Sequence, residues 1–149
     1  MPAAFFYIVL ALVAGACLPT QAGINARLTL WTRSPVTAAA ISFAVGTLAL
    51  VVYAVVLRIA LPDPSTAARQ PGWVWSGGVL GAFFVATMIV LAARLGAAPM
   101  VALVVCGQLT TSVLLDHFGW LGYPQHAISP GRILGIALMV AGIVLIKRY

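Results

Sequence analysis

Long apolar runs separated by short polar stretches dominate the chain. A helix needs about 20 residues to cross the hydrocarbon core of a membrane, and five runs come close to or exceed that length. These runs show neither the alternation nor the roughly 10-residue length that is typical of strands in a membrane barrel. The pattern therefore predicts an all-α integral membrane protein, in which one domain, residues 1–149, holds five transmembrane helices. The predicted spans cover approximately residues 3–25, 35–59, 73–95, 97–115 and 130–146.

Local signals support several of these boundaries. Ser34-Pro35 and Ser129-Pro130 each place an N-capping serine before a proline at the first helical position, where a missing N–H group costs nothing. Gly96 is suited to a left-handed cap after the third span.

Polar residues interrupt the first span in the stretch "LPTQAGINARL", residues 18–28. Gln21 and Asn25 are four residues apart and so share one helix face. Pro19 removes a backbone donor and Gly23 loosens the following turn, which predicts a helix break next to these two amides.

The fourth span carries a second polar face in "CGQLTTSVLLDHFGW", residues 106–120. Gln108, Thr111, Ser112 and Asp116 fall within an arc of about 140° on a helical projection. Asp116 pairs with Arg132, stays hydrated, or serves as a proton or cation site. An unpaired amide in hydrocarbon costs several kcal/mol, so both polar faces are expected to turn inward. They act either as hydrogen-bonding contacts between helices or as the lining of a polar cavity beside a broken helix, as in transporter sites near the bilayer midplane.

Composition supports the membrane assignment and excludes other classes. The chain is 63% hydrophobic and only 7% charged, whereas soluble domains carry about 25% charged residues. The net charge of +6 comes from single basic residues at segment ends, so a nucleic-acid partner is not expected. Cys17 and Cys106 lie in apolar runs without spaced ligands, and neither a metal nor another cofactor is expected. The chain lacks a Ser/His/Asp set, an HExxH motif and a phosphate loop, so an enzyme is not expected either.

Positive charge is almost balanced between the two sides of the membrane. With five spans, the side of the C-terminus holds five basic side chains and the other side holds three plus the α-amino group. The cytoplasmic side attracts positive charge, which favours an inward C-terminus. However, so small a difference is also typical of a protein that inserts in both orientations. The basic residues are Arg27, Arg33, Arg94, Lys147 and Arg148 on the first side, and Arg58, Arg69 and Arg132 on the second.

Small residues form two flat faces. Gly135 and Gly142 are seven residues apart in the last span, and Gly77 and Gly81 are four apart in the third. Such faces let helix backbones approach closely, so these glycines are candidates for packing between two copies of the chain.

The segments "LPTQAGINARL", "SPVTAAAISFAVGTLAL", "WVWSGGVLGAFFV", "GQLTTSVLLDHFGWLG" and "RILGIALMVAGIVLI" together resemble the YdcZ-type small membrane proteins of the drug/metabolite transporter superfamily. The resemblance covers nearly the whole chain, in order. It implies a five-helix unit in a bacterial inner membrane, known singly, as paired genes and as fused tandem copies. A second copy of a unit with an odd number of spans is inverted, so a single unit is expected to form an antiparallel homodimer.

The related small multidrug-resistance proteins carry an acidic residue in the first helix and pair through a glycine-spaced last helix. Gly135 and Gly142 resemble that pairing motif. The acidic residue is absent here, and the first span offers Gln21 and Asn25 instead. This difference argues against proton antiport by the mechanism of those proteins.

The leading hypothesis is a secondary transporter that exports a small polar or neutral metabolite or drug by alternating access in an antiparallel homodimer. Its partners would be the lipid bilayer, the substrate and an inverted second copy. The alternative is a structural or accessory subunit of a heteromeric complex with an oppositely oriented homologue. The candidate substrate-binding residues are Gln21, Asn25, Gln108, Ser112 and Asp116.

Overall fold

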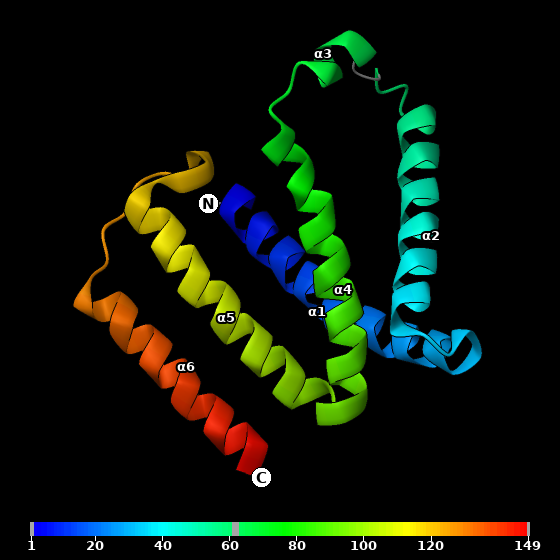
Figure 1. Cartoon of the computed structure of the whole chain (residues 1–149). Coiled ribbons are helices and arrows are strands. Elements are labelled where there is room, and N and C mark those ends of the chain that lie inside the picture. Colours follow the sequence, from blue (N-terminus) through cyan, green and yellow to red (C-terminus); the bar gives the residue numbers. More distant parts are fainter. Residues whose placement is uncertain (1, 61–62, 149) are drawn as a thin grey trace. The chain divides into compact units, whose positions relative to one another are not determined.

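Every regular element in the described part of the chain is helical. The computed structural model describes residues 2–60 and 63–148. The five long helices are α1 (Pro2–Thr32), α2 (Pro35–Val56), α4 (Ser76–Leu95), α5 (Ala97–Phe118) and α6 (Pro130–Arg148). Three short elements lie in the connections: α3 (Pro64–Ala68), η1 (Gly72–Trp75) and η2 (Trp120–Gly122). The prediction of an all-α protein is confirmed for these residues (Figure 1).

Four of the described helices are long and apolar enough to cross a membrane. They are Ala4–Thr32, Pro35–Val56, Gly72–Leu95 and Ala97–Phe118. The apolar part of α6, Pro130–Ile146, is shorter than these four. The helices therefore comprise four candidate spans and one shorter apolar helix, at the positions where the sequence predicts five spans.

The predicted helix starts at Ser34 and Ser129 are confirmed. The Ser34 hydroxyl accepts a hydrogen bond from the backbone N–H of Thr37 at 3.2 Å. The Ser129 hydroxyl accepts one from the backbone N–H of Arg132 at 3.3 Å. Gly96 has φ 80° and ψ 169°, so its φ is positive as predicted but its ψ lies outside the left-handed helical region. That combination is essentially restricted to glycine.

Helix α1 corrects two predictions. It continues without interruption through Pro19 and Gly23, so neither residue breaks the helix. Proline removes only one of the many backbone hydrogen bonds of this 31-residue helix, and prolines are tolerated within membrane helices. The helix also continues to Thr32, whereas the predicted span stops at residue 25. Its end is set by local backbone chemistry, because Pro35 disfavours helical geometry at Ser34.

Helix α2 ends three residues before the predicted boundary at residue 59. The backbone N–H of Ile59 bonds to the carbonyl of Ala54 at 2.9 Å, and that of Arg58 bonds to the carbonyl of Val55 at 3.1 Å. This is the hydrogen-bond pattern of a Schellman cap, with Arg58 at φ 52° in the position that glycine usually occupies. The sequence does not reveal this cap because it contains no glycine there.

The remaining boundaries differ by a few residues. Helix α5 extends to Phe118 instead of residue 115, and Gly119 then caps it at φ 62° and ψ 27°. The single turn η1 precedes α4, so the α-helix begins at residue 76 rather than 73.

The chain consists of two compact units, Met1–Arg94 and Leu95–Tyr149, and each is described by itself. In the first unit, Ala38 and Ala39 of α2 pack with Ile89 of α4 in a small buried cluster. Leu28, Val85 and Ala86 pack against this cluster, so α1, α2 and α4 share one core. In the second unit, α5 and α6 lie side by side (Figure 1). That the whole chain forms one domain stays a prediction.

Large apolar side chains cover the outside of the helices. Phe5 and Leu50 are each 70% exposed and Leu138 is 64% exposed. A protein surrounded by water rarely presents such extensive apolar surface. These faces are suited to contact with lipid.

Candidate functional site

The two amides of α1 lie on one helix face but differ in exposure. Gln21 is exposed, whereas Asn25 is only 3% exposed. The Asn25 Nδ2 atom is buried and donates no hydrogen bond to any described residue. A buried donor without a partner is costly, and native proteins contain few of them. Asn25 therefore carries a buried donor without a partner among the described residues, which is uncommon in native proteins.

Gln21 and Asn25 border two hollows, which we call the small pocket and the open groove. The small pocket, of about 10 Å³, lies toward α4 and is lined also by Phe84, Val85 and Met88. Its volume is about that of one water molecule. The open groove, of about 500 Å³, lies toward α2. The volume of the open groove lies within the range of about 300–1,000 Å³ that is typical of small-molecule sites.

The open groove combines apolar walls with uncharged polar groups. Its apolar residues include Val13, Ala16 and Ile24, and its polar residues include Thr20 and Ser42 besides the two amides. The Thr20 hydroxyl donates to the Ala16 carbonyl at 2.9 Å, so its donor is already used. Among the described residues, no carboxylate, guanidinium, ammonium or imidazole lines the groove. This arrangement can hold an uncharged solute by hydrogen bonds and apolar contact.

Ser42 was not among the predicted site residues. It belongs to α2, is half-buried and lies on the groove opposite the amides of α1. A polar residue in the run "AAISFAV" is the signal that could have identified it, although a lone serine in a membrane helix usually bonds to its own backbone.

The predicted residues of the fourth span lie in the second unit. Gln108 and Ser112 are on α5, and both are exposed. The neighbouring Thr110 hydroxyl donates to the Cys106 carbonyl at 2.8 Å, as expected for a hydroxyl that satisfies its own backbone. A pathway that Gln108 and Ser112 share with Gln21 and Asn25 stays a prediction.

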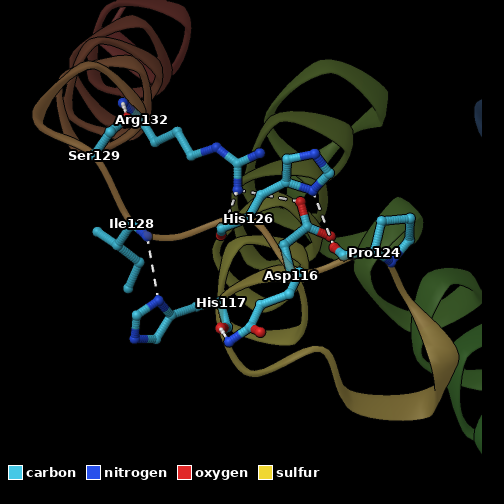
Figure 2. A network of polar contacts seen from close by, with 8 residues as sticks. Asp116, His117, Pro124, His126, Ile128, Ser129 and Arg132 are labelled. Atoms are coloured by element: carbon cyan, nitrogen blue, oxygen red, sulfur yellow. Dashed lines mark hydrogen bonds and ion pairs between the residues drawn. The ribbon is translucent and has the colours of Figure 1, made fainter.

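Asp116 takes part in an ion pair with Arg132, which is one of the roles predicted for it. Its Oδ2 atom lies 3.2 Å from Nη1 of Arg132 (Figure 2). The same guanidinium nitrogen donates to the carbonyl of His126 at 3.4 Å. The carbonyl of Asp116 in turn accepts the N–H of His126 at 2.8 Å. These bonds connect the end of α5 with the start of α6.

His117, which follows Asp116, also stabilises the connection between α5 and α6. The sequence does not indicate this role of His117. The Nδ1 atom of His117 accepts the backbone N–H of Ile128 at 3.2 Å (Figure 2). The side-chain amide of Gln125 donates to the His117 carbonyl at 3.0 Å. The polar end of α5 thus organises the loop between α5 and α6, so Asp116 and His117 have a structural role in this unit.

The predicted packing glycines separate into two groups. A Cβ atom on Gly81 would lie 3.5 Å from Cζ of Phe43, so Gly81 already packs against α2 of the same chain. Whether Gly81 also packs against a second copy stays a prediction. Gly77, Gly135 and Gly142 have no atom within 4 Å of such a Cβ, so their faces are open and their packing against a second copy stays a prediction.

No group of three or more His, Cys, Asp or Glu side chains that could hold a metal ion occurs among residues 2–60 and 63–148.

The four helices that are long and apolar enough to cross a membrane define a multi-pass helical membrane protein. The model of a family described as "Putative inner membrane exporter, YdcZ" matches residues 6–145, and the chain belongs to this family of inner membrane proteins. It is 38% identical over 76 residues to the inner membrane protein YdcZ of Escherichia coli (strain K12). That alignment covers 51% of this chain and 50% of the relative. No solved structure matches the chain.

Proposed function

We propose that this protein exports a small, uncharged or polar solute across the inner membrane by alternating access, as an antiparallel homodimer. Membership of a family described as inner membrane exporters supports transport as the activity. The uncharged lining of the groove supports the proposed solute class. The charge balance and the open glycine faces support the proposed dimer.

The unpartnered Asn25 donor is the observation that carries this proposal. A side chain with a purely structural role would be expected to find a hydrogen-bond partner within its helix bundle, because the unpaired group costs about 1–3 kcal/mol. Asn25 instead remains without a partner while bordering a groove large enough for a solute. Binding sites commonly carry such a cost, since the groups that recognise a ligand are unsatisfied until the ligand arrives.

The inverted second copy explains two further features. Five basic side chains on one side against three on the other give little preference for one orientation. The glycine face of α6 is open within the chain and allows close helix packing. In such a dimer the two protomers are equivalent, so an exchange of conformations between them alternates the access to the site.

Topology and transport can be tested on the full-length protein. A C-terminal tag should be accessible to impermeant reagents from both sides of the inner membrane, in comparable amounts. In proteoliposomes, counterflow of labelled neutral polyols and amides should depend on Asn25 and Gln108. Asn25→Ala and Gln108→Ala should lower transport by tenfold or more while the dimer still assembles. A tag exposed on one side only would contradict the inverted dimer, and loss of folding in both variants would support a structural role for the amides.

A further inference from the structure

We infer that the open groove is a complete binding site within a single chain, and that it selects an uncharged solute that presents a hydrogen-bond-accepting oxygen to Asn25. This inference rests on the proposed transport function and deepens it. It differs from a chamber shared between two subunits, because residues from α1 and α2 of one unit supply all the groups that it needs.

The polar groups of the groove determine which ligand atom binds. The Nδ2 atom of Asn25 is a donor without an acceptor, and the Gln21 amide on the same face can supply a second donor. The ligand must therefore offer acceptor oxygens, such as a carbonyl or hydroxyl oxygen. The Ser42 hydroxyl can donate or accept and so can bond to a second polar atom of the ligand.

The position of Asn25 between the small pocket and the open groove suggests how its amide reaches a ligand. Its Nδ2 atom is buried, although the residue borders both hollows. A rotation of the side chain turns the amide from the interior toward the open groove. An acceptor atom of the ligand then bonds to the donor that was unpaired. The contact is therefore favourable only for a ligand that carries an acceptor.

The walls of the groove exclude charged ligands. Val13, Ala16 and Ile24 form apolar surface, and the described lining offers no counter-ion for an ammonium or a carboxylate. Transfer of an unpaired charge into such surroundings is far more costly than transfer of a neutral amide. The ligand therefore combines an apolar body with a neutral acceptor group.

Three probes of the same shape test this specificity. Benzamide carries a neutral carbonyl acceptor, benzoate is an anion and benzylammonium is a cation. Binding of each labelled probe is measured on the full-length protein in nanodiscs by scintillation proximity. We expect benzamide to bind at one molecule per chain, and the two ions to bind at least tenfold more weakly.

Variants assign the binding to the groove. Asn25→Ala should weaken benzamide binding about tenfold or more, because the inner donor is lost. Ser42→Ala, a smaller change on α2, should weaken it about 2- to 10-fold and serves as a second test if Asn25→Ala does not fold. Gln70→Ala removes an exposed amide in the connection before α4 and should leave the affinity unchanged.

The outcomes separate this inference from the proposed function. No benzamide binding, equal binding of the ions, or unchanged affinity in both groove variants would overturn the inference. One benzamide per two chains would also overturn it, in favour of a chamber shared between subunits, while leaving the transporter proposal in place. Conversely, benzamide binding at one per chain in a protein with a single orientation and no counterflow would support the site and contradict the proposed function.

Discussion

Replacing Asn25 by leucine should stabilise the protein and abolish its transport. Leucine has a similar branched shape and no polar atoms. The substitution therefore removes a buried donor that has no partner among the described residues. Such an unsatisfied group costs about 1–3 kcal/mol. For a chain of this size each kcal/mol corresponds to about 2–4 °C in Tm, so the expected increase is about 2–12 °C.

The assay is a thermal melt of the purified protein followed by near-UV circular dichroism, run beside solute counterflow. Gln70→Leu is the matched control, since it replaces an amide that is exposed and outside the core, and its Tm should change little. A Tm that falls in Asn25→Leu by more than in the control would refute the reasoning. That result would mean that the amide forms a stabilising hydrogen bond, as expected for a contact between helices.

Three further predictions concern other parts of the chain. Gly142→Leu should leave the unfolding of the monomer unchanged, because the space around Gly142 is open within the chain, but it should weaken dimerisation measured by analytical ultracentrifugation. Gly81→Leu should instead lower Tm, because the larger side chain clashes with Phe43. Asp116→Asn should lower Tm by no more than about 2–4 °C, and less at high salt, since an ion pair with side chains 32% and 30% exposed contributes about 1 kcal/mol or less. The pKa of Asp63 lies below its ordinary value of 3.8 because the hydroxyl and backbone N–H of Ser65 donate to its carboxylate. This cap should therefore stabilise α3 fully above pH 3.8 and lose its effect as the pH falls through the lowered pKa. Amide hydrogen exchange, corrected for intrinsic rates, can follow this loss of protection, and Asp63→Asn should remove the pH dependence.

The helices were largely predictable because their causes are local. Apolar runs of membrane length and the caps at Ser34 and Ser129 depend on residues close together in the sequence, and the structure agrees with them. Where the prediction was wrong, a backbone feature without a sequence signal decided the outcome. Arg58 adopts the conformation usually left to glycine, and α1 passes through Pro19 without a break.

The candidate site was predictable only in part, for a physical reason. The spacing of Gln21 and Asn25 shows that they share one helix face. It does not show which of the two side chains is buried. Nor does spacing show which residue of another helix, here Ser42, lies opposite, because that depends on how α1 and α2 pack. Likewise the contact of Gly81 with Phe43 follows from packing between helices and cannot be read from the glycine pattern.

Cys17 allows the most direct test of the claim that the open groove receives solute from water. It borders the open groove and is exposed, and it is one of the two cysteines of the chain. In a Cys106→Ser background, a membrane-impermeant maleimide applied to sealed vesicles should label Cys17, and benzamide should slow the labelling. Labelling by membrane-permeant maleimide alone, at a rate that benzamide does not change, would show that lipid rather than water and solute occupies this face, and would contradict the account.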